Sequence, residues 1–207
     1  MINLYEYEQS LWNQGLLMVA GCDEAGRGPM AGPLVAAAVV LDPNHKIPGL
    51  NDSKKLSTKR REELYAQIME HAIEVHSTFI SVDEVDRLNV YQASKQAMMA
   101  SLASMKTKCN YVLTDAMPME WSVPCLDIIK GDAKSASIAA ASIIAKVERD
   151  HYMIELDRKY PNYGFKKHKG YVTKAHLEAI EVHGICPHHR KSFAPVQRIL
   201  EKQSNHR

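Results

Sequence analysis

Short apolar runs alternate along the chain with longer stretches in which apolar residues recur every three or four positions. The short runs predict β-strands and the longer stretches predict amphipathic helices. The predicted strands are Leu16–Gly21, Pro33–Leu41, Ile73–Val82, Tyr111–Thr114 and Leu126–Lys130. The predicted helices are Arg60–His71, Asp83–Met105, Lys134–Arg158, Lys174–His183 and Pro195–Lys202. This order predicts an α/β fold in which helices flank a mixed sheet, followed by a C-terminal helical appendage.

Local signals mark the ends of two of these helices. Ser57 can cap the first one, because its hydroxyl can accept a hydrogen bond from a free backbone N–H of the first turn. The sequence Pro161-Asn162-Tyr163-Gly164 ends the long third helix. The apolar periodicity around the first helix directs four side chains toward the core: Leu56, Leu64, Ile68 and Met69.

Length and composition predict a globular protein with one substantial domain. The chain has 207 residues, of which 45% are hydrophobic. No apolar run reaches the roughly 18 residues that a membrane span needs, and the N-terminus has no signal-peptide pattern. The four cysteines are scattered without a C-x-x-C pair. We therefore expect free thiols, a reducing cytoplasmic location and no membrane association.

The basic residues form two clusters, although the net charge is only +2. The first cluster is Lys54, Lys55, Lys59, Arg60 and Arg61; the second is Lys166, Lys167, His168 and Lys169, flanked by Tyr163, Phe165 and Tyr171. Basic residues interleaved with aromatic ones suit a nucleic-acid backbone. Each cluster taken alone fits a solvated face equally well.

Asp23 and Glu24 lie side by side at the end of the first predicted strand, and Gly26-Arg27-Gly28 follows. Two adjacent carboxylates are costly to bury unless a cation meets them. Mg²⁺ or Mn²⁺ would do so, because these ions prefer carboxylate oxygens. The pair alone also fits an ordinary strand-to-turn junction with solvated acids.

Two further acids occupy comparable positions. Asp115 ends one predicted strand, and Asp132 follows the next. Strand ends at one edge of an open sheet meet in one crevice, so Asp23, Glu24, Asp115 and Asp132 are predicted to converge. Carboxylates without His or Cys ligands indicate Mg²⁺ or Mn²⁺ and phosphate chemistry. Asp150 follows Asp132 by 18 residues, about five helical turns, so we expect it to support the site and not to bind metal.

Six strings together resemble bacterial ribonuclease HII over roughly Leu16 to Val196. They are Asp23-Glu24-Ala25-Gly26-Arg27-Gly28-Pro29, Asp52-Ser53-Lys54-Lys55-Leu56, Asp115-Ala116, Lys130-Gly131-Asp132-Ala133-Lys134, Ala139-Ala140-Ala141-Ser142-Ile143-Ile144-Ala145-Lys146 and His168-Lys169-Gly170-Tyr171. Each string alone is only suggestive, and their number and order make the match specific. One departure is Ala116, where the family often has glycine.

The resemblance implies a ribonuclease H-like catalytic domain over residues 1–160 and a C-terminal helical region over 161–207 that helps bind substrate. It implies two-metal-ion hydrolysis of the RNA strand of RNA–DNA hybrids, and incision 5′ of single ribonucleotides in duplex DNA, which leaves 3′-hydroxyl and 5′-phosphate ends and serves ribonucleotide removal. The implied partners are these nucleic acids, and the enzyme is expected to be a monomer.

The resemblance also implies a role for particular residues. Asp23, Glu24, Asp115 and Asp132 match the catalytic, metal-binding acids. Gly26, Arg27 and Gly28 match the loop that reads the 2′-hydroxyl, which distinguishes RNA from DNA. Tyr171 matches the tyrosine that packs against the sugar at the RNA–DNA junction. Ser53 and Lys54 lie in the strip that contacts phosphate.

Other functions fit parts of the sequence. Gly26–Ala31 fits the G-x-G-x-x-A pattern of dinucleotide-binding oxidoreductases, but it leads into a predicted strand and not a helix. A non-catalytic nucleic-acid-binding module would suit the basic clusters, but four gathered acids would weaken its binding. Within the resemblance, ribonuclease HIII is the type most easily confused with HII, and it usually has a further N-terminal domain and a lysine between the loop glycines. Arg27, and the 22 residues before Asp23, favour type HII.

Two weaker signals concern cysteine and histidine. His183, Cys186, His188 and His189 could suggest zinc, but no second Cys/His group accompanies them. We expect a turn with exposed histidines there. Cys22 is expected to be a small buried hydrophobe.

Overall fold

A five-stranded mixed sheet forms the centre of the computed structural model, which describes residues 3–204. The strands are β1 (Val19–Ala25), β2 (Leu34–Val40), β3 (Glu74–Ile80), β4 (Tyr111–Asp115) and β5 (Cys125–Ile128), in the order β3-β2-β1-β4-β5. The β1–β2 and β2–β3 pairs are antiparallel, whereas β1–β4 and β4–β5 are parallel. The predicted mixed sheet is therefore confirmed.

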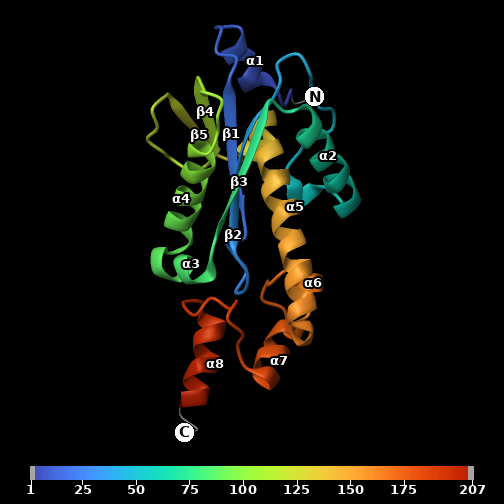
Figure 1. The fold of residues 1–207 in the computed structure, drawn as a ribbon, viewed down its shortest axis with the longest axis vertical. Coiled ribbons are helices and arrows are strands. Elements are labelled where there is room, and N and C mark those ends of the chain that lie inside the picture. Colours follow the sequence, from blue (N-terminus) through green and yellow to red (C-terminus); the bar gives the residue numbers. More distant parts are fainter. Residues whose placement is uncertain (1–2, 205–207) are drawn as a thin grey trace.

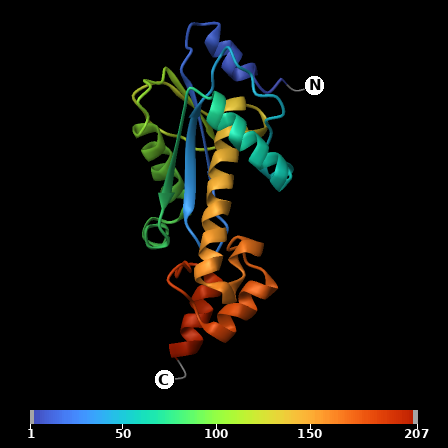
Figure 2. The same ribbon diagram turned by 45° about the vertical axis from the view of Figure 1, so that its right-hand side comes forward.

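Helices cover both faces of this sheet (Figures 1 and 2). On one face lie α2 (Thr58–His71) and the long α5 (Ala136–Lys159). On the other face lies α4 (Val90–Ala103), preceded by the short α3 (Val82–Leu88). A first helix, α1 (Glu6–Trp12), packs against the end of the sheet through Tyr7, Leu11 and Trp12.

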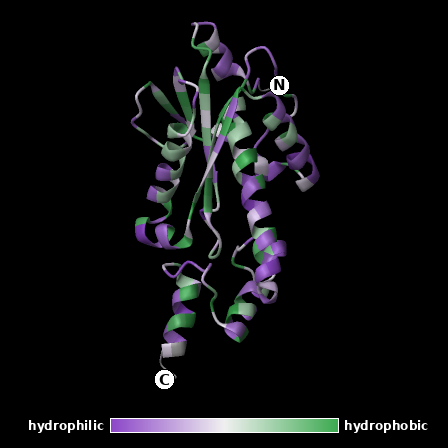
Figure 3. Cartoon of the chain, in the orientation of Figure 1, coloured by the Kyte–Doolittle hydropathy of each residue, from purple (hydrophilic) through white to green (hydrophobic). Residues whose placement is uncertain are grey.

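The central strands are buried on both faces, which explains their nearly continuous apolar sequence. Along β2, Val35, Ala37 and Val39 pack toward α2 and α5, and the alternate residues pack toward α4. Figure 3 shows hydrophobic residues on the strands and on the N-terminal part of α5, which lies beside the sheet. Small residues allow α5 to approach closely: a Cβ on Gly21 would lie 2.1 Å from the backbone of Ser137. The packing of α5 on β1 therefore excludes any side chain at position 21.

The C-terminal segment packs at the far end of α5 (Figures 1 and 2). It contains η3 (Pro161–Tyr163), α6 (Phe165–His168), α7 (Lys174–His183) and α8 (Ala194–Ser204). Its apolar cluster includes Met153 and Leu156 of α5, and Met30 and Ala31 from the β1–β2 connection. The helical appendage thus packs directly on the loop that follows Glu24. Among the described residues, no helix is both long and apolar enough to cross a membrane.

Several predicted boundaries are wrong for identifiable reasons. The first strand runs to Ala25 and not Gly21, because Asp23 and Glu24 pair with Ala37 and Ala36 of β2. The predicted helix 83–105 is interrupted at Asn89, whose φ of +68° ends α3 and whose side chain caps α4. The sequence patterns did not predict α1. Met69 is 49% exposed and does not face the core.

Candidate active site

Three aspartates converge at the edge of the sheet where β1, β4 and β5 end. Asp23 lies in β1 and Asp115 ends β4, whereas Asp132 lies in the turn η2 (Gly131–Ala133) after β5. The parallel register places Cys22 beside Thr114, so the next residues along both strands are neighbours. One carboxylate oxygen from each aspartate lies within 4.8 Å of the other two. The predicted convergence is therefore present for these three residues.

Backbone groups hold two of the aspartates in place. Asp23 Oδ1 accepts a hydrogen bond of 2.7 Å from Glu24 N–H, and Asp115 Oδ1 accepts one of 2.7 Å from Gly131 N–H. The second bond joins the end of β4 to the turn that carries Asp132. Ala116, directly after Asp115, adopts a φ of +46°, a left-handed conformation that glycine adopts more readily. Glycine would therefore fit this position with less backbone strain than alanine.

Glu24 does not join the group of three. Its Oε1 lies 3.5 Å from Arg27 Nη1, and its side chain is only 10% exposed. The pair links the fourth predicted acid to the Gly26-Arg27-Gly28 loop. Burial raises the pKa of Glu24, while the nearby Arg27 guanidinium opposes that rise. Its role as a metal ligand stays a prediction.

The aspartate cluster is electrostatically strained without a cation. Burial, with repulsion from Glu24 and Asp115, raises the pKa of Asp23 well above its usual value. Burial, with repulsion from Asp115, raises the pKa of Asp132 to about 6. Lys54 faces the cluster, and although burial lowers the pKa of its amine, attraction to the aspartates raises it overall. A set of oxygen ligands with excess negative charge fits a hard divalent metal.

Two cavities lie at this site, and Lys54 lines both. The larger, about 480 Å³, is lined by Asp52, Lys54, Lys55, Asp115, Ala116, Ile129, Lys130, Asp132 and Ala133. The smaller, about 290 Å³, is lined by Glu24, Ala25, Gly26, Arg27, Gly28, Ser53, Lys54, Ser142, Lys146 and Tyr171. Asp115 and Asp132 thus line the larger cavity, while Glu24, the glycine loop and Tyr171 line the smaller one.

Tyr171 lies across the smaller cavity from the glycine loop. The residue is 45% exposed, and a Cβ on Gly28 would lie 3.5 Å from its ring atom Cε1. Lys54 and Arg27 are exposed in the same region, while Ser53 is only 3% exposed. The Ser53 hydroxyl is 2.9 Å from that of Ser142, so its predicted contact with phosphate stays a prediction.

Two buried arginines hold the glycine loop from behind. Arg149 donates to the carbonyls of Pro33, Ala31 and Lys169. Arg190 donates to those of Gly26, Arg27 and Gly32. Burial lowers the pKa of both guanidinium groups, to about 10 and about 9 respectively. The sequence did not single out either arginine for this role, because each one reaches backbone carbonyls more than 100 residues away.

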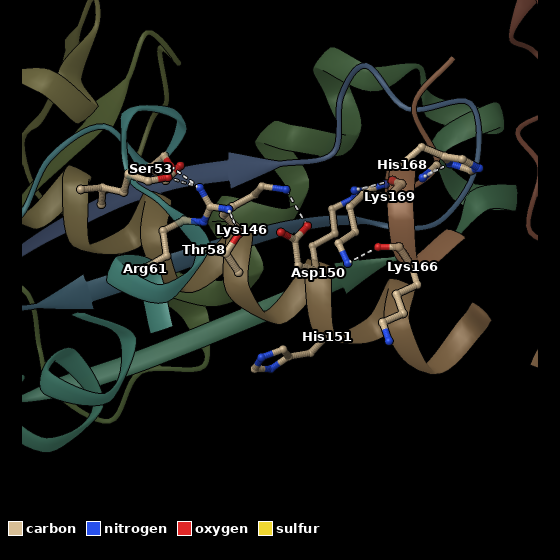
Figure 4. A network of polar contacts seen from close by, with 12 residues as sticks. Ser53, Thr58, Arg61, Lys146, Asp150, His151, Lys166, His168 and Lys169 are labelled. Atoms are coloured by element: carbon tan, nitrogen blue, oxygen red, sulfur yellow. Dashed lines mark hydrogen bonds and ion pairs between the residues drawn. The ribbon is translucent and has the colours of Figure 1, made fainter. Parts of the chain in front are cut away.

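Asp150 lies along α5, outside the aspartate group. Its Oδ1 is 2.5 Å from Lys146 Nζ (Figure 4), and Lys146 lines the smaller cavity. In the same view, Arg61 donates to the carbonyl of Ser53. Asp150 therefore pairs with one cavity-lining lysine, and the half-buried Arg61 binds the backbone of cavity-lining Ser53.

The alternative interpretations fare differently. Gly26–Ala31 leads into strand β2, so the helix that a dinucleotide site requires is missing there. Over residues 3–204, the only group of three or more His, Cys, Asp or Glu side chains arranged to hold a metal is the aspartate group. The expectation of exposed histidines is wrong for His189, which is 1% exposed because it packs against Tyr163 and Phe165. Cys22 is fully buried, as predicted.

Together, the mixed sheet, the converging carboxylates and the adjoining basic cavity define a metal-dependent nuclease of the ribonuclease H-like fold. A sequence model of the family "Ribonuclease HII" matches residues 20–196. A ribonuclease HII of Bacillus mycoides is 55% identical over 201 residues, which cover 97% of this chain and 78% of the relative. The chain therefore belongs to the ribonuclease HII family, whose enzymes cleave RNA in RNA–DNA hybrids.

Solved structures support the same fold. The crystal structure of ribonuclease H2 from Pyrococcus horikoshii aligns with a TM-score of 0.78 and 27% identity, covering 89% of this chain and 97% of that one. The ribonuclease HII in a complex with PCNA from Archaeoglobus fulgidus aligns with a TM-score of 0.72 and 29% identity, covering 84% and 94%. The predicted ribonuclease H-like class is confirmed.

Proposed function

We propose that this enzyme incises duplex DNA 5′ of a single embedded ribonucleotide, in addition to cleaving the RNA strand of RNA–DNA hybrids. The observation that carries the proposal is a pair of cavities that share Lys54: Asp115 and Asp132 line one, and the Gly26-Arg27-Gly28 loop and the exposed Tyr171 line the other. A site of this kind can bind a phosphodiester at the acids while it contacts one sugar beside them.

The acids would hold Mg²⁺ or Mn²⁺. Asp23, Asp115 and Asp132 provide oxygens within 4.8 Å of one another. Glu24 follows Asp23 in the chain and forms an ion pair with Arg27. The bound ions would supply electrostatic stabilisation of the negative charge that develops during phosphodiester hydrolysis. Of the described residues, Lys54 is the cation that all three aspartates attract, and it is placed to contact the phosphate backbone.

The loop and Tyr171 would recognise the ribonucleotide. Arg190 and Arg149 engage carbonyls of the loop and its flanks, which keeps the backbone of residues 26–28 fixed against the cavity. Fixed backbone groups can recognise a 2′-hydroxyl by hydrogen bonds, and that hydroxyl distinguishes RNA from DNA. The ring of Tyr171 offers a flat surface for the next sugar, and its hydroxyl can reach a phosphate or 2′-OH.

The biological setting follows from this activity. Incision beside a ribonucleotide, with 3′-hydroxyl and 5′-phosphate ends, would begin ribonucleotide removal from DNA. The four cysteines form no disulfide, which is compatible with the proposed cytoplasmic location. A monomeric state is the simplest arrangement for a site built within one chain.

The test is cleavage of three labelled duplexes: all-DNA, DNA with one ribonucleotide, and an RNA–DNA hybrid. We expect metal-dependent cleavage of the last two, with the lone-ribonucleotide product ending immediately 5′ of the ribonucleotide. Chemical identification of the ends should give 3′-hydroxyl and 5′-phosphate. Cleavage of the hybrid without incision at the lone ribonucleotide would reject the proposal.

A further inference from the structure

Three histidine rings, His168, His176 and His189, lie against one another in the C-terminal segment, close behind Tyr171. His176 and His189 are 0% and 1% exposed. The rings of His168 and His176 are stacked, with centroids 4.2 Å apart and planes 15° apart. His176 Nε2 lies 3.0 Å from His189 Nε2. None of these three rings forms an ion pair with a carboxylate in the part of the chain that the structure describes.

The hydrogen bonds fix the tautomer of each ring. His176 Nδ1 lies 2.9 Å from the carbonyl of Tyr171, so it must donate. In a neutral ring its Nε2 then accepts, and His189 Nε2 must donate to it. His189 Nδ1 is left to accept, which matches the Cys186 N–H at 3.0 Å, its shorter contact with that backbone. One neutral arrangement therefore satisfies the contacts from the Tyr171 carbonyl through His176 and His189 to the Cys186 N–H.

His168 completes this network from the other side. Its Nε2 donates to the carbonyl of Tyr163 at 2.7 Å, and its Nδ1 accepts from Gly170 N–H at 3.2 Å. Its own carbonyl accepts from Tyr171 N–H. Burial lowers the pKa of His176 and of His189 to about 4, which agrees with neutral rings at physiological pH.

The network controls the backbone on both sides of Tyr171. His176 binds the Tyr171 carbonyl, and His168 binds the N–H groups of Gly170 and Tyr171. The Gly170 carbonyl in turn accepts from Met30 and Ala31, just after the glycine loop. Arg190, next to His189, donates its backbone N–H to the carbonyl of Met30, and its guanidinium donates to the carbonyl of Gly26. Tyr171 and the loop that faces it are therefore fixed by one buried set of contacts.

We propose that His176, supported by His189, is a positioning residue for Tyr171, and that its hydrogen bond to the Tyr171 carbonyl sets how well the enzyme reads a lone ribonucleotide. The inference rests on the proposed function. His176 does not touch substrate: it acts through the backbone of Tyr171, and its loss moves the ring away from the loop. A long hybrid can be cleaved at many positions and depends less on one sugar contact. Cleavage of long hybrids should therefore be less sensitive to loss of the His176 hydrogen bond.

A matched pair of variants separates positioning from general stability. The amide of asparagine can occupy the place of Nδ1, so His176→Asn keeps the donor to Tyr171. The amide of glutamine can occupy the place of Nε2, so His176→Gln removes that donor while it keeps a polar side chain of similar size. His183→Ala, on the exposed side of the same helix, is the control.

The readout is the ratio of kcat/KM on the lone-ribonucleotide duplex to kcat/KM on the hybrid. We expect His176→Gln to lower this ratio about five-fold, the effect of losing one hydrogen bond. His176→Asn and His183→Ala should keep the wild-type ratio. An equal ratio in the Asn and Gln variants would overturn the proposal.

A double variant adds an independent test. If His176 acts through Tyr171, then Tyr171→Ala combined with His176→Gln should be no worse on the lone ribonucleotide than Tyr171→Ala alone. Additive losses would overturn the proposal. The wild-type enzyme reports separately on the proposed function, because failure to incise the lone-ribonucleotide duplex would reject that function before any variant is compared.

Discussion

At the scale of single residues, the charge of the aspartate cluster contributes to how the stability of the metal-free protein depends on pH. The pKa of Asp132 is about 6 in the folded state and near 4 in an unfolded chain. The folded state therefore keeps a proton that the unfolded state has released. The stabilisation from that proton is complete below about pH 4 and is lost as the pH rises through about 6.

We therefore expect Asp132→Asn to alter the pH dependence of stability. In metal-free buffer, the unfolding temperature of wild type should fall relative to that of the variant as the pH rises from about 4 to about 6. Calorimetry across this range, with a chelator present, gives the difference curve. A difference that does not vary with pH would show that Asp132 is not buried among like charges.

Tyr171 allows its ring and its hydroxyl to be tested separately. Tyr171→Phe should lose only the hydroxyl's hydrogen bond, about 0.5–1.5 kcal/mol. Tyr171→Ala should lose the ring as well and fall hardest on duplexes with a lone ribonucleotide. The measurement is the ratio of cleavage efficiencies on the lone-ribonucleotide duplex and the long hybrid. An unchanged ratio in Tyr171→Ala would mean that the ring only packs against the loop.

Residue-scale prediction from sequence succeeded where local chemistry carries the signal. Asp23, Asp115 and Asp132 could be singled out because each charged residue follows an apolar run. Arg149 and Arg190 could not, because their partners are backbone carbonyls brought close only by folding. The buried position of His189 was missed for the same reason: its neighbours Tyr163 and Phe165 belong to two other elements, η3 and α6.

At the scale of elements, α5 positions a lysine at the cavity through an ion pair one turn apart. Asp150 and Lys146 are 2.5 Å apart and both are largely buried. We expect Asp150→Asn to leave the metal concentration for half-maximal activity nearly unchanged and to raise KM for substrate several-fold, because Lys146 loses its partner. Glu155→Gln, which removes an exposed pair with Arg158 on the same helix, is the control.

The Asp150 experiment has a clear contrary result. A large loss of Mg²⁺ or Mn²⁺ affinity, measured by titration calorimetry, would place this carboxylate at the metals. Unchanged KM together with unchanged metal dependence would show that Lys146 needs no partner to reach its place.

The sequence predicted the type of most elements correctly, but it predicted their boundaries less accurately. Apolar patterns predicted all five strands and the long helices, because both faces of the sheet are covered. The end of β1 was misplaced because pairing with β2 carries the strand through two charged residues. The break between α3 and α4 at Asn89 depends on a positive φ, and the spacing of apolar residues carries no information about φ.

At the scale of the whole molecule, the site is assembled from both ends of the chain. The sheet and the turn after β5 provide the acids, and the C-terminal segment provides Tyr171, which faces the loop, and Arg190, which binds the loop carbonyls. The order of elements was enough to predict a mixed sheet with a helical appendage. It could not predict that Met30 and Ala31 share an apolar cluster with that appendage. The division at residue 160 stays a prediction, and this shared cluster suggests that the two parts fold together.

The most direct test of the central claim is incision of a duplex with one ribonucleotide by wild type, Asp23→Asn and Asp115→Asn, in Mg²⁺ and in Mn²⁺. Glu24→Gln should behave like these two variants, and Asp132→Asn should be severely but less completely impaired. We expect Asp23→Asn and Asp115→Asn to lose at least about a hundred-fold in kcat, with unfolding temperatures equal to wild type or higher. Wild-type rates for Asp23→Asn in Mg²⁺ would contradict the assignment of these aspartates to the metal site.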